Sequence, residues 1–124
     1  MRIMTVDDSK ATRLFIKSAI DVLGFKFLEA ADGREGLDLL KKENGNVDLI
    51  LLDWNMPVMD GMEMLKRLQA DELLNAIPVT VVTTEHERDK IAEAIDRGAK
   101  NYLIKPFSQE DLIGKIMESL GMGL

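Results

Sequence analysis

The chain alternates short apolar runs with longer segments in which apolar residues recur every three or four positions. The short runs are rich in residues that favour extended backbone and predict β-strands, whereas the longer spacing predicts amphipathic helices. Five strands are expected, at residues 3–6, 25–30, 48–52, 79–82 and 102–104. Five helices are expected to carry Leu14 to Leu23, Leu37 to Leu40, Met64 to Leu68, Ile91 to Ile95 and Leu112 to Leu120.

Residues at the ends of these segments support the same division. Gly24 and Gly98 each follow a helical segment, where glycine commonly ends a helix. Asp60 precedes the third helical segment and is expected to be its N-cap. The stretch 108–111, Ser-Gln-Glu-Asp, predicts a capping box at the start of the last helix. The charged run 85–90 is expected to be the solvated first turn of the fourth helix, and the tail 121–124 is expected to fray.

Strict alternation of strands and helices predicts the α/β class, with right-handed crossovers and an open, doubly wound parallel sheet that carries helices on both faces. The run 48–52 is apolar on consecutive residues after Asp48, as expected of a central strand covered on both sides. In such sheets, ligands bind beyond the carboxyl ends of the strands. The residues at those ends are therefore the candidates for function.

Composition limits the function further. A length of 124 residues fits one domain, and the content of 46% hydrophobic and 31% charged residues is typical of a globular protein. No apolar run approaches the ~20 residues of a membrane span, and the amino end lacks the apolar core of a signal peptide, so a cytoplasmic protein without membrane attachment is expected. The net charge of -6 disfavours nucleic-acid binding.

Polar residues follow the predicted strands at the edge where their carboxyl ends meet. These residues are Asp7, Asp8, Asp53, Thr83, Thr84 and Lys105. Three carboxylates within a few ångströms would repel one another by roughly 4 kcal/mol per close pair at an effective dielectric near 20, so a cation is expected between them. With no cysteine in the chain and no histidine near these residues, the ligands are oxygens and the candidates are Mg²⁺, Mn²⁺ and Ca²⁺.

Mg²⁺ fits best, because it needs only one or two carboxylates together with a phosphate oxygen. Lys105 and Thr83 could balance and hydrogen-bond the oxygens of a phosphoryl group beside the metal. A carboxylate can itself act as the nucleophile toward phosphorus and form an aspartyl phosphate. Asp53, at the end of the central strand, is best placed for that role.

Four segments together resemble the receiver domain of two-component response regulators, and most closely the stand-alone chemotaxis type. They are VDD ending at Asp8, DWNMPVMDG at 53–61, VVTTE at 81–85 and YLIKPF at 102–107. The resemblance covers essentially the whole chain and implies one receiver domain over residues 1–124 with no output domain. The flavodoxin-like strand order 2-1-3-4-5 is likewise the known order of this family and is taken from the resemblance.

The resemblance also implies roles for single residues. Asp53 would be the phosphoacceptor, and Asp8 and the backbone carbonyl of Asn55 would bind Mg²⁺ together with it. Asp7 would act on the metal mainly through water. Thr83 would be a switch hydroxyl drawn toward the phosphoryl group.

Further roles follow from the same resemblance. Tyr102 would be a switch aromatic that moves between exposed and buried positions as Thr83 moves. Lys105 would pair with the phosphoryl oxygens, and the Lys105-Pro106 bond would be cis. Asn55 and Glu85 would tune dephosphorylation. Thr84 departs from the chemotaxis pattern, which has a smaller side chain there, and could slow entry of the phosphodonor.

The function implied is a switch rather than an enzyme, although it would catalyse its own phosphorylation and dephosphorylation. A histidine kinase or histidine phosphotransfer protein would phosphorylate Asp53. The face formed by the fourth helix, the fifth strand and the fifth helix would then change its affinity for a protein target, by chemotaxis analogy a component of the flagellar motor switch. The protein is expected to act as a monomer.

Three other functions are alternatives to this switch. A phosphate shuttle or sink within a phosphorelay uses the same chemistry, and the sequence does not separate it from the motor-switch function. A phosphatase of the haloacid dehalogenase kind needs an acid two residues after the nucleophile, where this chain has Asn55. A nucleotide or flavin binder is disfavoured because neither glycine-rich phosphate motif occurs.

Overall fold

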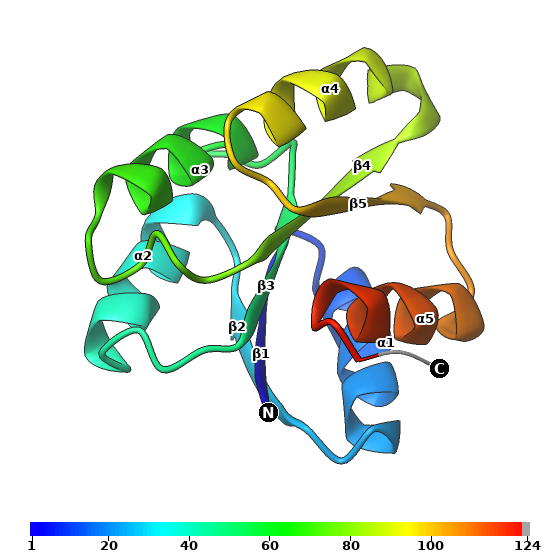
Figure 1. Cartoon of the computed structure of the whole chain (residues 1–124). Helices are drawn as coiled ribbons and strands as arrows, with labels where there is room; N and C mark the ends of the chain where they lie inside the picture. The colour runs from blue at the N-terminus through cyan, green and yellow to red at the C-terminus, as the bar shows by residue number, and fades with distance from the viewer. Residues whose placement is uncertain (123–124) are drawn as a thin grey trace.

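The computed structural model describes residues 1–122 and has the predicted architecture (Figure 1). Its five strands form one parallel sheet in the order β2-β1-β3-β4-β5. The expected α/β doubly wound fold and its strand order are therefore both confirmed. Residues 123–124 of the tail that was expected to fray lie outside the described part of the chain.

The strands and helices alternate along the described residues. In chain order they are β1 (Arg2–Val6), α1 (Lys10–Val22), β2 (Lys26–Ala30), α2 (Gly33–Lys42), β3 (Leu49–Asp53), α3 (Gly61–Ala70), β4 (Val79–Thr84), the 3₁₀ helix η1 (Glu85–Glu87), α4 (Asp89–Asp96), β5 (Asn101–Lys105) and α5 (Gln109–Ser119).

The sheet separates two apolar cores, with α1 and α5 on one face and α2, α3 and α4 on the other (Figure 1). Strand β3 contributes to both, because Leu49 and Leu51 pack on the α1–α5 side whereas Ile50 and Leu52 pack on the opposite side. All four are fully buried. This explains the unbroken apolar run and confirms that β3 is central.

Side-chain caps fix the beginnings of four helices. The side chains of Ser9, Asp32, Asp60 and Ser108 accept hydrogen bonds from the backbone of α1, α2, α3 and α5 respectively. The expected N-cap at Asp60 and the capping box at Ser108 are confirmed. Gly24 and Gly98 have φ of 74° and 112°, a backbone that favours glycine after a helix.

Several predicted boundaries shift by a residue or more, and three of these corrections lie near the aspartates or Glu87. Strand β4 continues through Thr84, and β5 runs through Lys105, because these residues still pair across the sheet. The charged stretch 85–90, expected to be the first turn of a helix, instead begins with η1, and α4 starts only at Asp89. Within residues 1–122, no helix combines the length and apolar character that crossing a membrane requires.

Candidate functional site

Three aspartates meet at the carboxyl end of the sheet, as the strand ends predicted. Asp53 is the last residue of β3, and Asp7 and Asp8 directly follow β1. One carboxylate oxygen from each lies within 4.8 Å of the other two. Asp7 and Asp53 are buried whereas Asp8 is exposed, so the cluster has a closed floor and an open side.

Lys105 brings the nearest positive charge to this cluster. It ends β5, and its Nζ lies 3.0 Å from Asp7 Oδ2 and 3.6 Å from Asp53 Oδ1. The Lys105-Pro106 peptide bond that follows is cis, as expected. One lysine does not balance three carboxylates, so the site carries excess negative charge.

Several contacts fix Asp7 in place. Its backbone N–H donates to the carbonyl of Ala30 in β2 at 3.0 Å, and its own carbonyl accepts from Arg13 Nη1 at 2.6 Å. Its Oδ1 accepts from the backbone N–H of Ser9, and its Oδ2 accepts from Lys105. Both carboxylate oxygens of Asp7 thus have protein partners, which agrees with an indirect rather than a direct role at a metal.

The buried Asp53 carboxyl and the partly buried Lys105 ammonium perturb each other's pKa. Burial is the main cause that raises the pKa of Asp53 from 3.8 to about 7; the negative charge of Asp7 adds to it, and Lys105 opposes it. Burial pulls the pKa of Lys105 down, but the hydrogen bond to Asp7 and the charges of Asp53 and Asp7 outweigh it and leave that pKa above 10.5. The charged form of Asp53 therefore needs a further cation for stability.

The donor set suits a hard divalent cation. Asp7, Asp8 and Asp53 offer only oxygens within a 4.8 Å span, and their excess charge is what such an ion neutralises. Mg²⁺ keeps several waters and demands few protein ligands, so an open side at Asp8 is compatible with it. The backbone carbonyl of Asn55 stays a predicted ligand.

A second cluster lies beside the aspartates, where β4 ends. The hydroxyls of Thr83 and Thr84 donate to Glu87 Oε1 at 3.4 and 3.2 Å. The amide Nδ2 of Asn55, in the loop after β3, donates to Glu87 Oε2 at 2.5 Å. Glu87 thus joins the expected switch residue Thr83 to the loop that follows Asp53.

Glu87 is a residue of this site that the sequence did not reveal. The family resemblance pointed to Glu85 instead, which is exposed and pairs with Arg88 at 3.5 Å. A continuous helix from residue 85 gave no reason to turn the side chain of Glu87 toward the strand ends, whereas the 3₁₀ geometry of η1 does so. The only signal in the sequence is a carboxylate four residues after Thr83.

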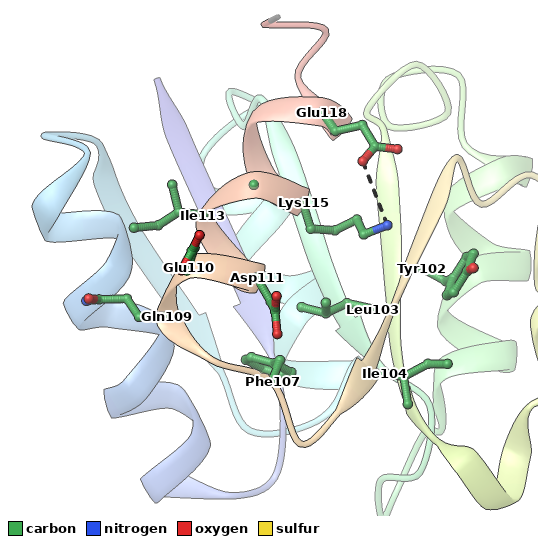
Figure 2. Close-up of a pocket in the computed structure, with 11 residues that line it drawn as sticks. Tyr102, Leu103, Ile104, Phe107, Gln109, Glu110, Asp111, Ile113, Lys115 and Glu118 are labelled. Atoms are coloured by element: carbon green, nitrogen blue, oxygen red, sulfur yellow. Dashed lines mark ion pairs between the residues drawn. The ribbon is translucent and has the colours of Figure 1, made fainter. Parts of the chain in front are cut away.

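Tyr102 lies on β5, away from the aspartates, beside a cleft between β5 and α5 (Figure 2). The cleft has a volume of about 850 Å³ and is lined by apolar residues such as Leu103 and Phe107 and by charged residues of α5. Lys115 Nζ lies 5.0 Å from the centre of the Tyr102 ring. The ring is 36% exposed, so it is accessible at this surface, and its movement stays a prediction.

Comparison with known proteins agrees with this geometry. The model of the response regulator receiver domain matches residues 3–117. Chemotaxis protein CheY-3 of Vibrio cholerae is 41% identical over 97% of this chain and 94% of its own length. A chemotaxis protein CheY homolog of Campylobacter jejuni is 39% identical over 99% of this chain and 95% of its own.

Solved structures show the same fold. The structure of chemotaxis protein CheY4 of Vibrio cholerae superposes with a TM-score of 0.87 at 33% identity, covering 95% of this chain and 97% of that one. A Francisella response regulator receiver domain superposes with a TM-score of 0.83 at 32% identity, covering 97% and 96%. Sequence, fold and the cluster of aspartates and lysine at the strand ends lead to one conclusion: this chain belongs to the response regulator receiver domain family and is of the CheY type.

Proposed function

We propose that this chain is a cytoplasmic, monomeric signalling switch that accepts a phosphoryl group on Asp53 and then changes its affinity for a protein target. The observation that carries the proposal is the convergence of Asp7, Asp8, Asp53 and Lys105 at one edge of the sheet. The donor would be a histidine kinase or a histidine phosphotransfer protein. The membership of the family supports this choice of chemistry.

Asp53 is the nucleophile in this proposal. Its carboxylate oxygen forms a bond to phosphorus while the bond from phosphorus to the donor's nitrogen breaks, and the released imidazole takes up a proton. When bound by Asp8, Asp53 and the carbonyl of Asn55, Mg²⁺ supplies positive charge to the transferring oxygens. Asp7 holds Lys105 and the water around the metal in position.

Lys105 pairs with the phosphoryl oxygens once the acyl phosphate forms. Its ammonium already lies 3.6 Å from Asp53, so little movement is needed. The hydroxyl of Thr83 is proposed to hydrogen-bond the same oxygens, and Tyr102 to move inward as Thr83 moves. This couples the site to the surface formed by α4, β5 and α5, where the cleft beside Tyr102 opens (Figure 2).

The target of that surface is proposed to be a component of the flagellar motor switch. The similarity to chemotaxis proteins supports this choice. The cleft offers apolar contacts from Leu103, Phe107 and Ile113 with charged residues around them, a combination that suits a short amphipathic segment of a partner.

Trp54 provides the test, because it follows Asp53 directly and is 4% exposed. Its fluorescence should change saturably with Mg²⁺ and change again, reversibly, when acetyl phosphate is added. Asp53→Asn should abolish the second response completely, since it removes the nucleophile. Mass spectrometry of the intact protein should show one added phosphoryl group in the wild type and none in the variant.

Asp38→Asn is the matched control, because it removes an exposed carboxylate of α2 that pairs with Arg34. It should respond like the wild type. A phosphoprotein formed by Asp53→Asn would show that another residue is the acceptor. Absence of both responses and of any added mass in the wild type would refute the proposed function.

A further inference from the structure

Glu87 differs from the other charged residues of η1. Its side chain is 12% exposed, whereas that of Glu85, two positions earlier, is 63% exposed. No residue of η1 belongs to the apolar core, so the inward position of Glu87 is not explained by packing. Its polar contacts explain it instead.

Those contacts join two separate parts of the chain. One carboxylate oxygen accepts from the hydroxyls of Thr83 and Thr84 at the end of β4, and the other accepts from the side-chain amide of Asn55 after β3. We call these three hydrogen bonds the Glu87 bridge. Hydrogen bonds to a charged group are stronger than neutral ones, so the bridge holds both strand ends to η1.

The bridge conflicts with the proposed action of Thr83. A hydroxyl carries one proton, so Thr83 cannot donate fully to Glu87 and to a phosphoryl oxygen at the same time. Its bond to Glu87 is long at 3.4 Å and therefore weak, so a charged phosphoryl oxygen can displace it. Movement of Thr83 toward Asp53 thus requires that its contact with Glu87 breaks.

Electrostatics act in the same direction. A phosphoryl group near neutral pH carries a charge of roughly -1.5 to -2, which repels a carboxylate bound to a neighbouring side chain. On the outer side, Lys90 Nζ lies 3.7 Å from Glu87 Oε2, and the side chain of Lys90 is about half exposed. Repulsion from within and attraction from Lys90 both favour an outward position for Glu87 after phosphorylation.

We propose that Glu87 is a positioning residue that holds Thr83 and Asn55 in the unphosphorylated arrangement and moves away from both strand ends when Asp53 is modified. Its release frees η1 and the beginning of α4 to move, because the bridge ties η1 to both strand ends. This inference rests on the proposed function of Asp53. Glu87 thereby sets the free-energy difference between the two states of the switch.

Beryllofluoride with saturating Mg²⁺ tests this without a chemical step, because it binds a carboxylate as a phosphoryl mimic. Glu87→Ala should bind it about tenfold more tightly than the wild type, which corresponds to 1.4 kcal/mol, since the bridge no longer opposes binding. The midpoint of the Trp54 fluorescence change measures the affinity. Loss of structure alone would weaken binding, so tighter binding separates the proposed role from destabilisation.

Glu87→Gln keeps the shape of the side chain and one acceptor oxygen for the threonine hydroxyls, but it loses the charge and the second acceptor oxygen. Its affinity should rise about threefold, between those of the wild type and Glu87→Ala. Amide hydrogen exchange at residues 85–90 should be faster in Glu87→Ala than in the wild type before beryllofluoride is added, and equal afterwards.

Glu93→Gln is the control, because it removes one exposed carboxylate of α4 that pairs with Arg97. It should bind beryllofluoride like the wild type. If both Glu87 variants bind as the wild type does, or more weakly, the inference is wrong while the proposed function stands. If the wild type itself shows no response to beryllofluoride, the proposed function fails and the inference fails with it.

Discussion

Two parts of the carboxyl end of the sheet are built in different ways. On the side of Asp53, strand β3 is buried along its whole length and supplies both apolar cores. On the side of Glu87, η1 contributes no buried residue and α4 contributes only Ala94. The first turn of α4 also lacks the side-chain cap that α1, α2, α3 and α5 possess.

This difference suits the proposed function, in which one part of the site reacts and another part moves. The proposed nucleophile, Asp53, requires fixed geometry, and the most deeply packed strand provides it. The proposed switch requires a segment that opens at low cost, and segments with few buried apolar contacts have the lowest local stability. Under this proposal, the reactive carboxylate lies on the most rigid strand and the responsive segment includes the least packed helix.

Truncation of one apolar side chain on each side should give the largest contrast. Leu51→Ala in β3 should lower the free energy of unfolding by roughly 3–5 kcal/mol, because it opens a cavity at a fully buried position. Ile95→Ala in α4 should change it by less than about 0.5 kcal/mol, because Ile95 is 41% exposed. Urea unfolding of both variants measures the two values.

The wild type unfolded under the same conditions is the reference. If the unfolding free energy falls with urea concentration at the same slope in all three proteins, their free energies can be compared. A loss for Ile95→Ala as large as that for Leu51→Ala would contradict the comparison, since it would mean that α4 is held as firmly as β3.

The pH dependence of stability should show the cost of burying Asp53. Its pKa is about 7 in the folded protein against 3.8 when unperturbed, so the folded state holds the proton more tightly. Its contribution to stability is therefore fully present below pH 3.8 and is lost as pH rises toward 7. Without Mg²⁺, this loss should amount to roughly 4 kcal/mol between pH 4 and pH 8.

The difference in free energy of unfolding between Asp53→Asn and the wild type separates the contribution of Asp53 from those of the other carboxylates. In urea unfolding without metal, the free energy of unfolding of the variant should rise relative to that of the wild type as pH rises. This difference should level off above pH 7. Mg²⁺ should stabilise the wild type more at pH 8 than at pH 5, because the ion competes with the proton on Asp53. A pH-independent difference between the two proteins would contradict the assigned pKa.

The sequence predicted the surroundings of Asp53 better than those of Glu87, on the side that is proposed to move. The sequence alone predicted that four residues lie close together, because the carboxyl ends of parallel strands share one edge of the sheet. They are Asp7, Asp8, Asp53 and Lys105. Strands β4 and β5 were predicted to end too early, because the polar side chains of Thr84 and Lys105 suggested a loop. Both residues still pair in the sheet.

The strand order came from the resemblance to a family, because periodicity alone does not supply it.

The surroundings of Glu87 could not be predicted from the hydrophobic pattern either. The position of Glu87 depends on one 3₁₀ turn, and charged residues alone do not distinguish such a turn from the first turn of an α-helix. A side chain that acts through local backbone geometry leaves little signal in the hydrophobic pattern.

The smallest of these effects concerns Lys105, whose ammonium group donates a hydrogen bond to Asp7 and pairs with Asp53. Lys105→Ala should tighten Mg²⁺ binding by about tenfold, because it removes a competing cation 3.0 Å from Asp7 and 3.6 Å from Asp53. The same variant should respond incompletely to acetyl phosphate, because the phosphoryl oxygens lose their partner. Trp54 fluorescence measures both the metal affinity and the extent of the response.

Lys100→Ala, which removes an exposed lysine just before β5, is the control and should match the wild type in both measurements. Weaker Mg²⁺ binding by Lys105→Ala would mean that the lysine organises the aspartates more than it competes with the ion. A full response to acetyl phosphate would remove Lys105 from the switching machinery. Tighter metal binding together with an incomplete response would support two successive roles for the Lys105 ammonium group. It would compete with the metal ion for the aspartates before phosphorylation and bind the phosphoryl oxygens afterwards.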